Sequence, residues 1–209
     1  MSHPHFWLRA ETKPLEERRA LSPANAGKLV GQGFRVTVER SGQSAFDHQA
    51  YADAGCTCVA EGSWQENAPP DAYILGLKEL PESDTPLHHR HIYFAHAYKG
   101  QQGWQDILGR FRAGGGELLD LEYLTDLDGR RVAAFGYWAG FAGAAVAIEA
   151  WCARQDNQVL KNLSSHPNQQ GMVAHLQTCL GDRTPRVIVI GALGRCGQGA
   201  RAVAEQLGL

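Results

Sequence analysis

The stretch of sequence that decides the fold is Arg186-Val187-Ile188-Val189-Ile190-Gly191-Ala192-Leu193-Gly194-Arg195-Cys196-Gly197-Gln198-Gly199. The β-branched run at residues 186–190 predicts a strand. The glycines after it predict a tight turn, and residues 200–207 predict a helix. This order of strand, glycine turn and helix is typical of the corner at which a dinucleotide-binding fold holds a diphosphate.

The spacing of the glycines supports a ligand at this turn. They follow a G-x-x-G-x-x-G pattern, with Ala192 where the common fingerprint has its first glycine. Glycines let the main chain approach a diphosphate, and the start of the following helix adds free N–H groups and partial positive charge. The alternative is a glycine turn without a ligand, in which Cys196 is only a small filling side chain. The candidate cofactor contacts are Gly191, Leu193, Gly194, Arg195, Cys196 and Gly197.

The chain before this stretch has the pattern of an α/β domain. Short apolar runs at residues 73–77, 91–95 and 117–121 predict buried strands of a parallel sheet. Strands are also expected near 34–39 and 58–60, and helices near 22–32 and 104–112. We therefore expect a Rossmann-like parallel-sheet domain over residues 1–136.

From residue 137 onward the composition changes. Residues 137–154 are rich in Ala and Gly and predict a long helix that packs closely against its neighbours, and a further helix is expected from Pro167 to Gly181. We expect residues 137–209 to hold this interdomain helix and the first strand, turn and helix of a second, nucleotide-binding domain. The acidic residue that would hold the ribose belongs about 20 residues beyond the turn. The sequence therefore predicts an amino-terminal piece of a longer polypeptide.

Composition limits the possible functions. The 209 residues carry 20 Lys and Arg against 22 Asp and Glu, so nothing in the net charge favours nucleic acid or an anionic membrane as a partner. An apolar run of the roughly 20 residues that a membrane span needs is not found in the sequence. Five scattered cysteines are typical of reduced thiols in a cytoplasmic protein.

Charged residues follow three of the predicted strands. Lys78 and Glu79 follow the first, His96 and Lys99 the second, and Glu122 the third. The carboxyl ends of parallel strands meet at one edge of a sheet, so these groups are expected to share a ligand site suited to proton transfer. The alternative for each residue by itself is a solvated charge at a strand end.

Two other groups of residues bear on ligand binding, a set of cations near the start of the chain and a run of histidines. The segments 9–13 and 18–19 supply cations suited to carboxylates, with ordinary surface charge as the alternative. The run His88-His89-Arg90-His91 does not predict a metal site, because adjacent residues of an extended segment point in opposite directions.

These residues resemble the lysine-forming, NAD-dependent saccharopine dehydrogenases, a branch of the alanine dehydrogenase and transhydrogenase superfamily. The stretches that carry the resemblance run in order through nearly the whole chain. They are residues 8–16 (Leu-Arg-Ala-Glu-Thr-Lys-Pro-Leu-Glu), 76–79 (Gly-Leu-Lys-Glu), 94–99 (Phe-Ala-His-Ala-Tyr-Lys), 129–136, 139–145 and 191–197.

The resemblance implies a substrate-binding domain followed by an NAD-binding domain. It implies oxidative deamination of saccharopine to lysine and 2-oxoglutarate with NAD as cofactor. By match to the family pattern, Lys78 and His96 are the acid–base residues, and Glu79 and Glu122 adjust their pKa. The residues implied to bind substrate carboxylates are Arg18 and Arg131, with Lys13 assisting.

Two other functions remain open. One is a different amino-acid oxidoreductase of the same superfamily, such as an alanine dehydrogenase. The other is a fragment that binds a ligand without catalysis. In both readings the partner is a small molecule, and the oligomeric state is left open.

Overall fold

The computed structural model describes residues 3–209, which form two compact units. The first unit extends to Ala133 and the second runs from Ala134 to Leu209. Within the described residues, every assigned strand belongs to the first unit.

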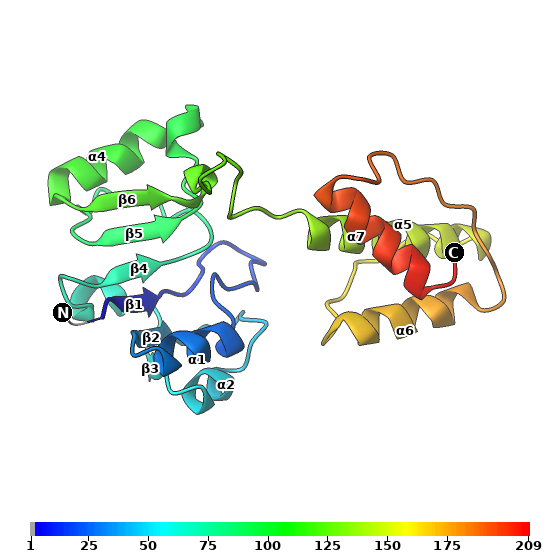
Figure 1. The fold of residues 1–209 in the computed structure, drawn as a ribbon, viewed down its shortest axis with the longest axis horizontal. Coiled ribbons are helices and arrows are strands. Elements are labelled where there is room, and N and C mark those ends of the chain that lie inside the picture. Colours follow the sequence, from blue (N-terminus) through cyan, green and yellow to red (C-terminus); the bar gives the residue numbers. More distant parts are fainter. Residues whose placement is uncertain (1–2) are drawn as a thin grey trace. The chain divides into compact units, whose positions relative to one another are not determined.

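The first unit is built on a six-stranded, all-parallel sheet (Figure 1). The strands lie in the order β3-β2-β1-β4-β5-β6, so the chain starts near the middle of the sheet, builds outward on one side and then on the other. This reversal next to β1 is the place at which open α/β sheets bind ligands. The strands are β1 (His5–Leu8), β2 (Arg35–Glu39), β3 (Thr57–Val59), β4 (Tyr73–Leu75), β5 (Arg90–Tyr93) and β6 (Glu117–Asp120).

Helices connect the strands of this unit. Ser22 caps α1 (Pro23–Gly31) by accepting the N–H of Asn25, and Asp47 caps α2 (His48–Asp53) by accepting the N–H of Gln49. Gly33 follows α1 with φ of 89°, the left-handed conformation that glycine adopts without strain. The remaining elements are α3 (Trp64–Asn67), α4 (Trp104–Gly114) and two short 3-10 turns, η1 (Ala97–Lys99) and η2 (Leu121–Tyr123).

Each face of the sheet has its own apolar core. Trp7 on β1 packs with Trp64 of α3 and Phe111 of α4, whereas the next residue, Leu8, packs with Val38 and with Tyr51 of α2. The side chains of a strand alternate between its faces, so one strand supplies both cores. The two-sided covering confirms the predicted α/β class and explains why the strands are short and apolar.

The second unit consists of helices. Its core joins Phe141 and Ile148 of α5 (Tyr137–Gln155) to Leu176 of α6 (Gln169–Leu180) and Val203 of α7 (Arg195–Gln206). Glycines bring α5 and α7 close together. A Cβ on Gly140 would lie 1.8 Å from the carbonyl oxygen of Cys196, and one on Gly199 would lie 1.9 Å from that of Tyr137. The predicted close packing of the Ala/Gly-rich helix is confirmed.

The predicted strand at residues 186–190 is not formed in this structure. These residues are assigned to no strand, and Ile188 and Ile190 are 89% and 95% exposed. A strand needs a hydrogen-bonded neighbour, and within residues 3–209 none pairs with this segment. The glycine turn is formed, but the helix after it begins at Arg195, inside the predicted turn, instead of at residue 200, and ends at Gln206. Of the helices in residues 3–209, none has the length and apolarity needed to cross a bilayer.

Candidate active site

Three of the predicted site residues gather around one carboxylate, Glu122. It lies in η2, just past the carboxyl end of β6, and is buried. Its Oε1 accepts a hydrogen bond from Lys99, and its Oε2 accepts one of 2.7 Å from Arg131. Nδ1 of His96 lies 3.8 Å from the same Oε2. The structure therefore brings His96 and Glu122 together, as predicted from their places at strand ends, and adds Arg131, which only the family resemblance had assigned to the site.

The cations around Glu122 keep its carboxylate charged. The hydrogen bond from Lys99 lowers the pKa of Glu122 most, and the charges of Arg131, Lys99 and His96 add to it against the opposing effect of burial. Glu122 thus holds one negative charge among three basic side chains. Within residues 3–209 no main-chain N–H donates to its carboxylate, which is contacted by the side chains of Lys99, Arg131 and His96.

His96 is held in an uncommon backbone conformation. Its φ of 54° and ψ of 15° place it in the left-handed region, where residues other than glycine are strained. Its Nδ1 is buried and has no hydrogen-bond partner among the described residues, and its ring stacks on Phe94 at 6.3 Å between centroids. A strained residue with an unused ring nitrogen beside a carboxylate is suited to exchange protons with a ligand.

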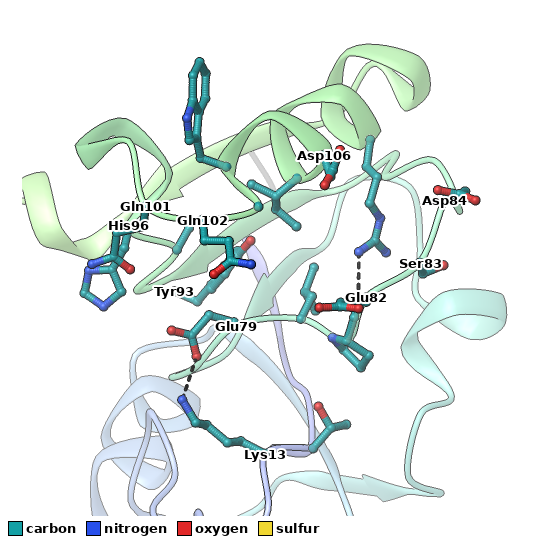
Figure 2. A pocket seen from close by; sticks show the side chains of 18 of the residues that line it. Lys13, Glu79, Glu82, Ser83, Asp84, Tyr93, His96, Gln101, Gln102 and Asp106 are labelled. Carbon is teal, nitrogen blue, oxygen red and sulfur yellow. Dashed lines mark hydrogen bonds and ion pairs between the residues drawn. The ribbon is translucent and has the colours of Figure 1, made fainter.

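A second ion pair joins the loops after β1 and β4. Lys13 Nζ lies 3.5 Å from Glu79 Oε2, and Figure 2 shows the two side chains pointing toward each other. Burial tends to raise the pKa of Glu79, but its own main-chain N–H and the charges of Lys13 and Lys78 outweigh it, so the pKa is lowered. Both groups are exposed and can therefore reach a ligand.

Lys78 and Arg18 lie close to a further carboxylate, Glu16. Arg18 donates to both oxygens of Glu16, with Nε–Oε1 of 2.7 Å and Nη2–Oε2 of 2.5 Å. These two hydrogen bonds from Arg18 lower the pKa of Glu16, and the positive charge of Lys78 lowers it further. Lys78 thus lies within the field of both Glu16 and Glu79.

The main chain at Lys78 is held by two fully buried residues of the β1 loop. Glu11 accepts the N–H groups of Leu77 and Lys78 at 2.7 and 2.9 Å, and Arg9 donates to the Lys78 carbonyl. A Cβ at Gly76 would lie 2.4 Å from Arg9 Nε, so any larger residue there would displace the buried Arg9 guanidinium. From the sequence, Arg9 is expected to be a cation suited to ligand carboxylates, with surface charge as the alternative, whereas the structure buries it as a main-chain support. The sequence pattern predicts no role for Glu11 and Glu16. The partners of these residues follow from burial, because a buried carboxylate or guanidinium must be hydrogen-bonded, and this burial is set by loop geometry that a short sequence pattern does not show.

A pocket of about 780 Å³ opens beside these groups. Lys13, Glu79 and His96 line one part of it, and Tyr93 lies in the middle of the lining in Figure 2. This volume is in the range of small-molecule sites. Its remaining walls come from the loop 80–84 and from residues 101–110, which include the first turn of α4.

The glycine turn of the second unit has the geometry of an anion cradle. Gly191 has φ of 76°, and a Cβ on Gly197 would lie 2.1 Å from the Gly191 carbonyl oxygen, so the turn folds back tightly onto the start of α7. Gly194 caps α7 without a side-chain hydrogen bond. Leu193, Arg195 and Cys196 are exposed at this turn. The residues present therefore fit a diphosphate, which needs free main-chain N–H groups and no Cβ in the way.

The histidine run has three separate environments. His88 Nδ1 contacts the Gly114 carbonyl, His89 Nε2 contacts the Ala68 carbonyl, and His91 is buried among aromatic rings. Burial lowers the pKa of His91 to about 3. Across the described residues 3–209, no three His, Cys, Asp or Glu side chains gather as metal ligands.

These features define the class of protein. An all-parallel sheet with helices on both faces and convergent charged groups at its carboxyl edge is a ligand-binding α/β domain. Residues 7–142 match the family model for the alanine dehydrogenase/PNT N-terminal domain. The chain belongs to this family.

Curated relatives extend the similarity over the whole chain. The saccharopine dehydrogenase [NAD(+), L-lysine-forming] of Schizosaccharomyces pombe is 50% identical, covering 100% of this chain and 59% of that protein. The protein of the same name from Yarrowia lipolytica is 52% identical, covering 97% and 57%. The predicted resemblance is confirmed, and the chain spans somewhat more than half the length of these relatives.

Solved structures share the fold. An L-alanine dehydrogenase superposes with a TM-score of 0.61 at 19% identity, covering 98% of this chain and 52% of that one. A transhydrogenase from Sinorhizobium meliloti gives a TM-score of 0.56 at 16% identity. At these identities the structural similarity supports the fold alone, and the reaction has to be argued from the residues of the site.

Proposed function

We propose that the chain is the amino-terminal part of an NAD-dependent saccharopine dehydrogenase that forms L-lysine and 2-oxoglutarate from saccharopine. The carrying observation is the cluster of His96, Lys99 and Arg131 around Glu122 at the carboxyl edge of the sheet. Relatives about 50% identical over the whole chain bear the name of this enzyme. A substrate with several carboxylates and a secondary amine needs both cations and proton-transfer groups, and the cluster offers both.

The proposed reaction needs two proton-transfer groups in addition to the coenzyme. The nicotinamide coenzyme, when bound, accepts hydride from the carbon attached to the secondary amine. Lys78 or His96, as a base, takes the proton of that amine, releases it to solvent, and then takes a proton from the attacking water. The other group, as an acid, protonates the departing amine of lysine. Glu79 and Glu122 place negative charge beside these two groups and set their proton affinity.

The carboxylates of the substrate are assigned to cations. Arg18 and Arg131 present exposed guanidinium groups that match carboxylates in two-point hydrogen bonds. Lys13 assists from the β1 loop through the exposed pair with Glu79. The glycine turn at Gly191, Gly194 and Gly197 is the proposed contact of NAD, through the diphosphate. We place the enzyme in the cytoplasm, an assignment supported by five unpaired cysteines in the described chain.

Steady-state kinetics of the full-length enzyme tests the proposal. NADH oxidation is measured with lysine plus 2-oxoglutarate and with pyruvate plus ammonia. Lys78→Met and His96→Gln are expected to lower kcat by about 10²-fold or more, the usual contribution of acid–base groups, and to leave NADH binding intact. Lys28→Met on α1 and His48→Gln on α2 are matched controls that should retain the rate.

Three outcomes would contradict the proposal. Turnover of pyruvate and ammonia alone would favour an alanine-dehydrogenase-like enzyme. Absence of binding of both NADH and saccharopine in calorimetry would favour a non-catalytic ligand-binding chain. Unchanged rates in both variants would reject the assigned roles of Lys78 and His96.

A further inference from the structure

The part of the pocket away from His96 is acidic. Glu82, Asp84 and Asp106 line it, from the loop after β4 and from the first turn of α4 (Figure 2). Among the described residues none of the three carboxylates forms an ion pair. Lys13 and Arg110 also line the pocket. Lys13 pairs with Glu79, and Arg110, which donates to the carbonyls of Pro81 and Thr85, sets one positive charge against the three carboxylates. The outer pocket therefore favours a cationic group.

A buried hydroxyl at the inner wall gives an independent sign of a ligand. Tyr93 is 1% exposed and lines the pocket, yet its Oη has no hydrogen-bond partner among the described residues. Burial raises the pKa of this phenol, so it remains a neutral donor. A buried hydroxyl normally finds a partner, and a carboxylate in the pocket would supply one.

The first turn of α4 adds a second feature that suits a carboxylate. Gly103 precedes this 11-residue helix with no side-chain cap, and Gly103 and Trp104 line the pocket. The first N–H groups of a helix lack partners within the helix and carry partial positive charge. The N–H of Trp104 already donates to the Gln101 carbonyl, so this helix start adds only its partial positive charge, and the carboxylate donor at the pocket is the Tyr93 hydroxyl.

We propose that this pocket binds the α-amino and α-carboxylate groups of the lysine moiety, with Glu82, Asp84 and Asp106 around the α-ammonium and Tyr93 Oη donating to the α-carboxylate. His96 and Glu79 at the other part of the pocket then face the ε-nitrogen, which is the reacting atom. The inference rests on the proposed function and names the part of the substrate that the pocket selects.

The test is steady-state kinetics of the full-length enzyme with lysine and with 6-aminohexanoate, which lacks only the α-amino group. Wild type is expected to prefer lysine by about tenfold or more, the value of one hydrogen bond to a charged group. The variant Glu82→Gln/Asp106→Asn should raise the KM for lysine about tenfold and remove this preference, with the KM for 2-oxoglutarate unchanged. Glu66→Gln, an exposed glutamate of α3 that does not line the pocket, is the matched control.

Tyr93→Phe separates the carboxylate contact from the ammonium contact. It should raise the KM for lysine and for 6-aminohexanoate alike, because both carry the carboxylate. An active wild type whose KM for lysine is unchanged by these substitutions would overturn the inference and leave the proposed function standing. A wild type inactive with lysine and 2-oxoglutarate would refute the proposed function and this inference with it.

Discussion

Three buried glutamates at the sheet edge, Glu11, Glu39 and Glu122, differ in the groups that donate hydrogen bonds to their carboxylates. Glu39 accepts hydrogen bonds from the N–H groups of Ala10, Gly62 and Trp64 and from the indole of Trp7, and Glu11 accepts those of Leu77 and Lys78. These two carboxylates fix loops. Glu122 is instead surrounded by side-chain cations, which supports the role proposed for it in the site.

Replacing Glu122 should change how stability depends on pH. Its folded-state pKa is lowered, so its contribution to stability is present above the unfolded value of 4.5 and is lost as pH falls through the folded value. Glu122→Gln is expected to cost about 1 kcal/mol at neutral pH and to flatten the loss of stability below pH 4.5. Urea denaturation between pH 3 and pH 7 measures both effects, within the usual titration range of carboxylates.

Glu117→Gln is the control for this experiment. Glu117 pairs with Arg90 at an exposed site, so its removal should leave the acid limb of the curve nearly unchanged. A Glu122→Gln variant with the same slope as wild type would contradict the role given to its partners.

At the scale of elements, the crossing of α5 and α7 depends on two glycines. Gly140→Ala would place a methyl group 1.8 Å from the Cys196 carbonyl, so the helices must separate. We expect a loss of about 3 kcal/mol, the upper part of the range for overpacking, and a lower Tm. Thermal unfolding followed by circular dichroism measures it.

Gly143 on the same helix is the matched control, because a Cβ there meets nothing within 4 Å. Gly143→Ala should be neutral or stabilise by up to about 1 kcal/mol through helix propensity. Equal effects of the two substitutions would show that the crossing does not depend on close contact at Gly140.

Local sequence signals predicted the elements well where the chemistry is local. Ser22 and Asp47 mark helix starts and Gly33 marks a helix end, because caps and left-handed turns involve only neighbouring residues. The central strand β1 was missed: four residues beginning with a histidine have too little pattern, and only pairing with β2 and β4 makes them a strand. The segment 186–190 shows the opposite error, because a strand is predicted there and is not formed. Its β-branched residues favour an extended conformation, but they do not supply a neighbouring strand to pair with.

The site was partly predictable for the same reason. Residues at strand ends share an edge by topology, so His96 and Glu122 were expected to meet. The cation partners of Glu122 and the hold of Glu11 on the main chain at Lys78 depend on loop geometry that one sequence does not encode in a short pattern. Lys99 lay in the predicted set, but its pairing with Glu122 follows from η1 and η2 lying at adjacent strand ends.

At the scale of the whole molecule, the two units have separate cores. The first unit has a complete sheet with apolar clusters on both faces, and the cluster of the second unit is confined to α5, α6, α7 and the chain end. A polypeptide of residues 1–133 is therefore expected to fold by itself and to unfold in one cooperative transition. Circular dichroism and tryptophan fluorescence should give coincident curves, and a gradual or probe-dependent transition would contradict this independence.

The side-chain surroundings of Glu122 have a consequence for ligand entry. The side chains of Lys99 and Arg131 are 45% and 41% exposed, so solvent-side space is open to both for turning away from Glu122 without disturbing the sheet. Glu122 is the counterion of these two cations, so a substrate carboxylate bound as proposed would exchange with it. The binding free energy of an anionic ligand is then the difference between two similar sets of ion pairs. One set joins Lys99 and Arg131 to Glu122, and the other joins them to the ligand, so binding is readily reversible.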